Sequence, residues 1–110
     1  MLFIILPIYN EEDSLPSLLQ DILSEFFDTE LQIIAVNDGS TDKSLDILKS
    51  QLRETDIICS HATNMNVGVV FSEGIREFLA RSTEDDVLII MESDNTSDIK
   101  LVRDLYATIQ

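Results

Sequence analysis

Three clusters of polar residues, each following a run of apolar residues, hold most of the side chains that could do chemistry. They are Pro7-Ile8-Tyr9-Asn10-Glu11-Glu12, Asn37-Asp38-Gly39-Ser40-Thr41-Asp42 and Glu92-Ser93-Asp94-Asn95-Thr96. Glu92 and Asp94 are two positions apart, so their carboxylates point to the same side of an extended chain. Paired hard oxygens suit Mg²⁺ or Mn²⁺ when phosphate oxygens complete the shell. The alternative is that they are ordinary loop acids preceding a helix.

The other two clusters admit both a binding role and a structural one. Asp38 lies in a turn just before a predicted helix, where it either caps that helix or accepts a hydrogen bond from a nucleobase N–H. Tyr9 either packs in the core or offers its ring as a platform for a base. The single histidine, His61, receives no role. The single cysteine, Cys59, excludes an internal disulfide and fits a reducing compartment.

The elements that must position these clusters are alternating apolar runs and amphipathic segments. Apolar runs predict strands over residues 2–6, 31–36, 56–59 and 86–91, with Pro7 ending the first. Apolar residues at helical spacing predict helices over 14–27, 41–52, 69–81 and 98–108. Strands that are apolar on both sides belong to a parallel sheet covered by helices on both faces. We therefore predict a single α/β domain over residues 1–110 with a Rossmann-like layer.

A doubly wound sheet of strand order 3-2-1-4 would bring the three clusters together. Strands 2, 1 and 4 are neighbours in that order. Ligands bind such sheets at the carboxyl edge where the order reverses, which here lies between strands 1 and 4. The convergence of the clusters at this edge is the main argument from the residues for a single site.

Composition and charge argue against several classes of partner. The net charge is -14, whereas a nucleic-acid binder needs Lys and Arg to displace counterions from phosphates, so we expect no nucleic-acid partner. The apolar start lacks the basic region of a signal peptide. No stretch approaches the roughly 20 apolar residues of a transmembrane segment. We therefore expect a cytoplasmic chain with no transmembrane segment of its own.

Taken together, the clusters resemble glycosyltransferase family 2, most closely its polyprenol-phosphate sugar synthase branch. The family motifs P-x-Y-N-E, D-D-G-S-T-D, N-x-G-x-G and D-x-D all find counterparts in order along the chain. These counterparts are Pro7–Glu11, Asn37–Asp42 with Asn37 for the first acid, Asn64–Gly68 with Asn66 for the first glycine and Gly74 beyond it, and Glu92–Asp94 with Glu92 for the first aspartate.

The resemblance implies a GT-A fold, a nucleoside-diphosphate sugar donor with UDP or GDP, an Mg²⁺ or Mn²⁺ ion, and inversion at the sugar carbon. It implies that Tyr9 and Asp38 hold the base, and that Pro7, Glu11 and Gly68 belong to the same pocket. It gives the metal to Glu92 and Asp94, with Thr96 where some relatives place a further ligand. The implied acceptor is a lipid phosphate, such as a polyprenyl phosphate, or a cell-surface glycan, and it leaves the catalytic base unidentified.

Family 2 enzymes have an acceptor-binding half beyond the metal motif, whereas the last predicted helix here reaches Gln110 without a stop signal. We therefore expect an incomplete domain that binds nucleotide but transfers no sugar alone. Ile99, Val102 and Leu105 should then expose an apolar face. A missing part could carry the enzyme to the cytoplasmic face of a membrane.

Three other function classes compete with this interpretation. A truncated, non-catalytic nucleotide-binding module would share the same residues. A receiver domain would need a phosphoacceptor aspartate after the third strand, but that strand ends at Cys59-Ser60-His61. A nucleotidyltransferase would need a glycine-rich, basic loop directly after the first strand, where Tyr9-Asn10-Glu11 stands instead.

Overall fold

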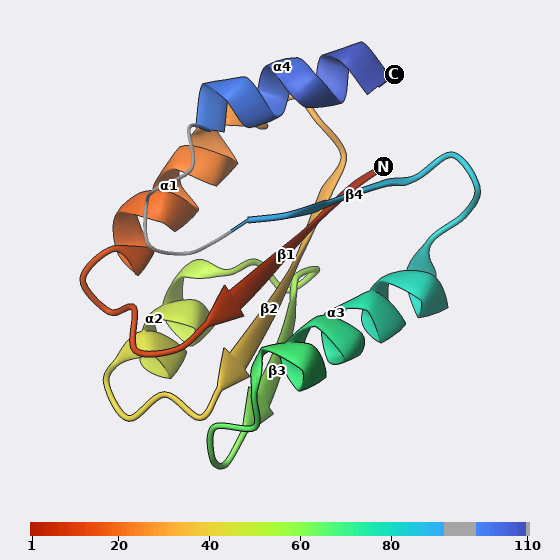
Figure 1. Ribbon diagram of the computed structural model, residues 1–110. Helices are drawn as coiled ribbons and strands as arrows, with labels where there is room; N and C mark the ends of the chain where they lie inside the picture. Colours follow the sequence, from red (N-terminus) through yellow and green to blue (C-terminus); the bar gives the residue numbers. More distant parts are fainter. Residues whose placement is uncertain (92–98, 110) are drawn as a thin grey trace.

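The computed structural model describes residues 1–91 and 99–109, and these form one parallel sheet with helices on both faces (Figure 1). The elements are β1 (Leu2–Ile8), α1 (Leu15–Glu25), β2 (Leu31–Asp38), α2 (Ser44–Gln51), β3 (Ile57–His61), α3 (Val67–Arg81), β4 (Val87–Ile90) and α4 (Ile99–Ile109). The strand order is β3-β2-β1-β4. This confirms the predicted order and the Rossmann-like layer, and every predicted element is present.

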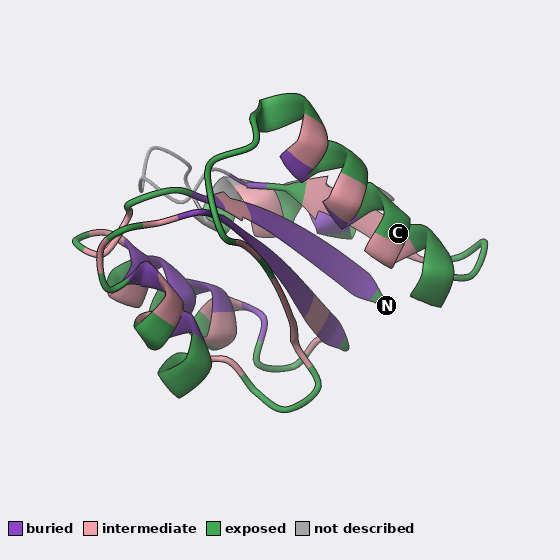
Figure 2. Ribbon diagram, turned by 90° about the horizontal axis from the view of Figure 1, so that it is seen from below, coloured by how far each residue is buried: buried purple, intermediate pink, exposed green. Residues whose placement is uncertain are grey.

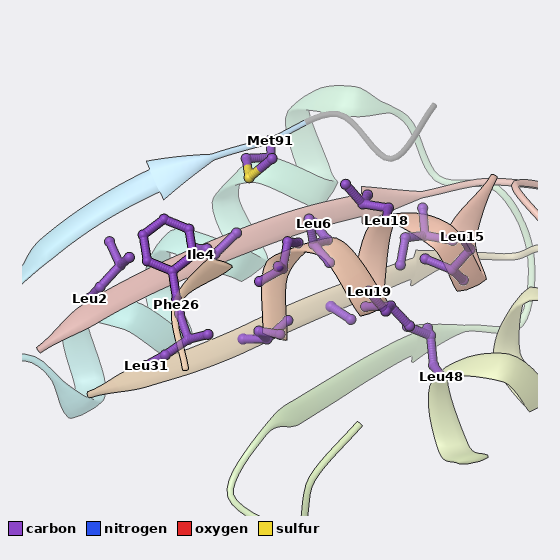
Figure 3. Close-up of a cluster of buried hydrophobic side chains, with 14 of the residues drawn as sticks. Leu2, Ile4, Leu6, Leu15, Leu18, Leu19, Phe26, Leu31, Leu48 and Met91 are labelled. Atoms are coloured by element: carbon purple, nitrogen blue, oxygen red, sulfur yellow. The ribbon is translucent and has the colours of Figure 1, made fainter. Parts of the chain in front are cut away.

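The two faces of the sheet bury different residues of β1, because successive side chains of a strand point to opposite sides. Leu2, Ile4 and Leu6 pack against α1 (Figure 3). Ile8 belongs to the same cluster, to which α2 and α4 also contribute. Phe3 and the other side chains of the opposite face pack under α3. The buried residues are concentrated in β1 and β2 at the centre of the sheet (Figure 2).

The spacing of apolar and small residues explains how the covering helices pack on the sheet. In α1 the buried side chains Leu15, Leu18, Leu19 and Ile22 recur at helical spacing, so one stripe of the helix faces the core. In α3 the contact with β1 is made at Gly74. A Cβ at this glycine would lie 2.9 Å from Ile5 Cγ2, so the absence of a side chain lets the helix approach the sheet closely.

Pro7 does not end the first strand, contrary to expectation. It pairs with Val36 of β2, and β1 continues to Ile8. The ladder to β4 ends at Ile5↔Ile90, whereas the ladder to β2 continues. Along β1, the backbone N–H and C=O groups of successive residues point alternately toward β2 and toward β4. The Leu2 N–H donates to Glu30 on the β2 side, and the Ile5 C=O accepts from Met91 on the β4 side. By this alternation the Pro7 nitrogen faces the β4 side, past the last β1–β4 pair, Ile5↔Ile90. A proline is tolerated where no ladder partner is lost.

Of the three α4 residues expected to form an exposed apolar face, Val102 is partly buried instead, whereas the side chains of Ile99 and Leu105 lie outside the described part of the structure. Val102 packs against the larger core cluster, and Tyr106 is buried with an edge-to-face contact to Phe26. Arg103 lies over the Phe26 ring at 5.7 Å and forms an ion pair with Asp28. Helix α4 is thus anchored on α1. Exposed apolar side chains lie instead on α3 and β4, among them Leu79 and Ile90.

Candidate nucleotide site

The loops that follow β1 and β2 are joined by hydrogen bonds between motif residues. Asn10 Oδ1 accepts from the Thr41 N–H at 2.8 Å, and the Asn10 N–H donates to Ser40 Oγ at 3.0 Å. Ser44 Oγ, fully buried at the start of α2, accepts from the Glu11 N–H at 2.9 Å. Several polar residues of the two clusters therefore hold the loops after β1 and β2 together, and the two loops form one continuous edge at the carboxyl ends of the strands.

Gly39 brings a third loop against this edge. Its φ of +74° lies in the left-handed region that favours glycine. A Cβ at Gly39 would lie 2.3 Å from the Thr63 carbonyl carbon and 2.4 Å from the Asn64 nitrogen. The turn after β2 can therefore sit directly on the loop after β3 only because residue 39 has no side chain.

A cavity of about 550 Å³ lies at this carboxyl edge, within the size range of small-molecule sites. It is lined by Pro7, Ile8, Tyr9, Glu11, Asp38, Asn64, Asn66, Val67, Val70 and Phe71. Four of the five residues predicted to bind nucleotide, Pro7, Tyr9, Glu11 and Asp38, are thus brought together. Gly68 lies in the first turn of α3 and is not among the lining residues.

Tyr9 is available to a ligand, because it is 46% exposed and lines the cavity. The alternative of a buried packing tyrosine is therefore wrong. Asp38 does not cap α2, which begins at Ser44. Its Oδ1 accepts instead from the Met65 N–H at 2.9 Å and from His61 Nδ1 at 2.8 Å. Both hydrogen bonds of Asp38 to the described residues use this one oxygen, which leaves Oδ2 for a ligand.

His61 is a residue of this site that the sequence analysis left without a role. Its Nδ1 bonds to Asp38 and its Nε2 to Glu73 of α3. The hydrogen bonds to Asp38 and Glu73 raise the pKa of His61 above its usual value, against the opposing effect of burial. The only signal in the sequence was that an acid and a histidine lie near the ends of two predicted strands. That Asp38 and His61 are register partners is seen only in the structure.

The predicted metal ligands Glu92, Asp94 and Thr96 lie outside the described residues. Within residues 1–91 and 99–109, no group of three or more His, Cys, Asp or Glu side chains is placed to hold a metal ion. In the same residues, no helix has the length and apolar composition needed to cross a bilayer.

Burial, followed by the nearby charge of Glu73, raises the pKa of the Cys59 thiol to about 11, which keeps it protonated near neutrality.

Comparisons with known proteins agree with this arrangement. A family model described as "Glycosyl transferase family 2" matches residues 3–110. The undecaprenyl-phosphate 4-deoxy-4-formamido-L-arabinose transferase of Proteus mirabilis is 27% identical over 112 residues, covering 97% of this chain and 33% of that protein. The uncharacterized glycosyltransferase YibD of Escherichia coli K12 is 32% identical over 75 residues, covering 67% of this chain and 22% of that protein.

The fold matches a solved structure as well. S. aureus TarS 1–349 superposes with a TM-score of 0.72 at 25% identity, over 98% of this chain and 32% of that chain. TarS 1–349 in complex with UDP gives a TM-score of 0.75 at 24% identity, over 98% and 31%. The chain thus spans about a third or less of the length of these proteins. Because the family model covers residues 3–110 and the strand order is the one expected of the GT-A layer, the chain belongs to glycosyl transferase family 2.

Proposed function

We propose that the cavity binds the nucleotide of a nucleoside-diphosphate sugar, the donor for glycosyl transfer. The observation that carries the proposal is the pairing of an exposed aromatic ring with an available carboxylate oxygen in one cavity. Tyr9 lines the cavity and is 46% exposed, while Asp38 keeps Oδ2 for a ligand. A base would stack on Tyr9 and donate a ring N–H to Asp38.

The chemistry of Asp38 favours some bases over others. An ionised carboxylate only accepts hydrogen bonds. Uracil and guanine carry a ring N–H that can donate to Asp38, whereas cytosine and adenine have an unprotonated ring nitrogen at the comparable position. The exocyclic amino groups of cytosine and adenine can donate, but only beside this ring nitrogen, whose lone pair would be repelled by the carboxylate. This supports UDP or GDP rather than CDP or ADP as the bound nucleotide.

The diphosphate needs positive charge. Among the described residues, those that line the cavity include the acids Glu11 and Asp38 and no Lys or Arg. The N-terminal end of α3, at Asn66 and Val67, lines the cavity and offers the positive end of the helix dipole. That dipole amounts to only about half an elementary charge. This shortage of positive charge for the diphosphate supports a divalent cation as part of the proposal.

We assign the proposed Mg²⁺ or Mn²⁺ to Glu92 and Asp94, with Thr96 as a further candidate. Strand β4, which these residues follow in the sequence, pairs with β1 beside the cavity edge. When bound, the ion would neutralise charge on the departing nucleoside diphosphate. Glu92 is one methylene longer than the aspartate of the motif, so Asp94 is the better-matched ligand.

The proposed reaction is an inverting transfer of the sugar to a polyprenyl phosphate or a cell-surface glycan. The acceptor is suggested by the family and by the name of the Proteus mirabilis relative. A polyprenyl acceptor would place the reaction at the cytoplasmic face of a membrane. The described cavity concerns the donor only, so a nucleotide-binding module without turnover remains the second candidate.

Calorimetric titration tests donor binding. UDP, GDP, CDP and ADP should be titrated into the wild type and Asp38→Asn, with Asp46→Asn on the exposed side of α2 as the matched control. We expect UDP or GDP to bind best, and Asp38→Asn to weaken that binding about tenfold, as for a lost charged hydrogen bond. Equal binding of all four nucleotides, or no effect of Asp38→Asn, would contradict the base-binding role.

The metal and the transfer are tested separately. The same titration with and without Mn²⁺, on the wild type and Asp94→Ala, should show a metal-dependent gain only in the wild type. Equal affinity in all four titrations would remove the metal role. Turnover is measured as transfer from radiolabelled UDP- or GDP-sugars to polyprenyl phosphate. Transfer would support the glycosyltransferase, and nucleotide binding without transfer would support the second candidate.

A further inference from the structure

Behind the cavity, three ionisable side chains from three elements form a continuous chain of hydrogen bonds. Asp38 ends β2, His61 ends β3 and Glu73 lies in α3. The Asp38 carboxylate meets His61 Nδ1 at 2.8 Å, and His61 Nε2 meets the Glu73 carboxylate. Asp38 and His61 are largely buried, with side-chain exposures of 7% and 13%, and Glu73 is half-buried.

The partners of His61 determine its protonation state. Each ring nitrogen faces a carboxylate, and an ionised carboxylate cannot donate a hydrogen bond. Both nitrogens must therefore carry a hydrogen for both bonds to form, which makes the ring an imidazolium. The charged groups that act on His61 are Asp38 from β2 and Glu73 from α3, and the hydrogen bonds to both raise its pKa.

The arrangement also constrains Asp38. Its Oδ1 receives two donors, His61 Nδ1 and the Met65 N–H, so the carboxylate is held from two directions. Asp38 lines the cavity, while His61 and Glu73 do not. The histidine therefore acts on one oxygen of the carboxylate from behind and leaves the other oxygen for the ligand.

We propose that His61, held by Glu73, is a positioning residue that fixes the orientation and charge of Asp38 for recognition of a base N–H. This inference rests on the proposed nucleotide site and adds to it a determinant of base selectivity outside the cavity wall. The competing explanation is that His61 only ties β3 to α3. The two differ in one respect: positioning affects ligands that donate to Asp38, whereas a structural tie affects all ligands equally.

The experiment uses UDP and 3-methyl-UDP, whose uracil nitrogen has no hydrogen to donate. The amide of His61→Asn can take the place of Nδ1 and still bond to Asp38. The amide of His61→Gln reaches instead toward the place of Nε2 and Glu73. Glu77→Gln is the matched control, because it removes a charge from the next turn of α3, where Glu77 pairs with Arg81. Circular dichroism and urea unfolding establish that each variant is folded.

We expect the wild type to prefer UDP over 3-methyl-UDP by about tenfold, the value of one charged hydrogen bond. His61→Gln should lose most of this preference by weakening UDP binding alone. His61→Asn should keep affinity for UDP within about threefold of the wild type, and Glu77→Gln should behave as the wild type. An equal loss of both ligands in His61→Gln would identify a purely structural role and overturn the proposal.

Failure of this inference can be separated from failure of the proposed function. If wild type and His61→Gln prefer UDP equally while Asp38→Asn does not, Asp38 binds the base and only the positioning role is refuted. If the wild type does not discriminate the two ligands, base recognition by Asp38 fails and the positioning role fails with it.

A second measurement needs no ligand. The chain has one histidine, so the imidazole ¹⁵N signals belong to His61 without ambiguity. Both ring nitrogens should be protonated at pH 6.5, and Glu73→Gln should move the titration midpoint to lower pH. A neutral ring at pH 6.5 would overturn the charge that the proposal requires.

Discussion

The three glycines of the chain provide a graded test of how closely the loops and helices pack. Gly39→Ala is the severe change, because φ is +74° and the added Cβ would lie 2.3 Å from the Thr63 carbonyl carbon. To reach an ordinary contact of 3.4 Å, the loop after β3 must move by about 1 Å. That loop carries the Met65 N–H bonded to Asp38, so the displacement also threatens this hydrogen bond.

The magnitude for Gly39→Ala combines two terms. A left-handed backbone costs a residue with a Cβ about 1–2 kcal/mol. Loss of a hydrogen bond to a charged group costs about 1.5–3 kcal/mol. We therefore expect the free energy of unfolding to fall by about 2.5–5 kcal/mol, a large part of the roughly 5–15 kcal/mol typical of a small domain.

The other two glycines serve as internal comparisons. An alanine Cβ at Gly74 would lie 2.9 Å from Ile5 Cγ2, so overpacking should cost about 1–3 kcal/mol, partly offset by about 1 kcal/mol of helix propensity. At Gly68 the nearest atom is Asn66 Oδ1 at 3.2 Å, a side-chain atom that can shift slightly. Gly68→Ala in the first turn of α3 should therefore be neutral, or stabilising by up to about 1 kcal/mol.

Urea unfolding followed by circular dichroism measures all three variants under identical conditions. The expected order of unfolding free energies is Gly68→Ala highest, then Gly74→Ala, then Gly39→Ala. If Gly39→Ala were as stable as Gly68→Ala, the turn after β2 would not be pressed against residues 63 and 64. The account of how the cavity edge is assembled would then be wrong.

Three further predictions concern pH, helix docking and the ligand. The stability that the protein gains from the contacts of His61 with its carboxylate partners should be complete below the unfolded pKa of His61 and should be lost as pH rises through the raised folded pKa. Urea titrations at several pH values should show this loss in the wild type. The same loss in His61→Gln would refute the assignment to His61. Arg103→Ala should lower the urea midpoint through loss of its contact with the Phe26 ring, worth about 0.5–1 kcal/mol at an exposed site, and an unchanged midpoint would contradict this anchor for α4. Uridine, which lacks phosphates, should bind with the same affinity with or without Mn²⁺ by calorimetry, and a strong metal requirement would show that base recognition also depends on the ion.

The fold could be predicted from the sequence because the signals for its helices and strands are local. Apolar runs and helical spacing mark each element, and the rules of parallel α/β topology then limit the strand order. Pro7 was misjudged because its effect depends on the pairing with the neighbouring strands, and the described ladder between β1 and β4 ends at Ile5↔Ile90. The spacing within one segment carries no information about the neighbouring strand.

The site was predicted in part for the same reason. The four predicted nucleotide-binding residues that line the cavity belong to motifs at strand ends, whose convergence follows from topology. The role of His61 depends on the register that pairs it with Asp38 and on a helix residue twelve positions later, Glu73. Neither relation is visible without the coordinates of three elements. The contact of Val102 with the core likewise depends on how α4 docks on α1.

The loops of the cavity edge also have a consequence for the order of events during synthesis. Every described residue that lines the cavity falls between Pro7 and Phe71, so the ribosome has added all of these before it begins β4 at Val87. The acids proposed to hold the metal are added later still. Under the proposed function, the described base-binding residues and the proposed metal ligands are therefore encoded in successive, non-overlapping stretches of the gene. Substitutions in the first stretch would then act on the base, and substitutions in the second on the ion.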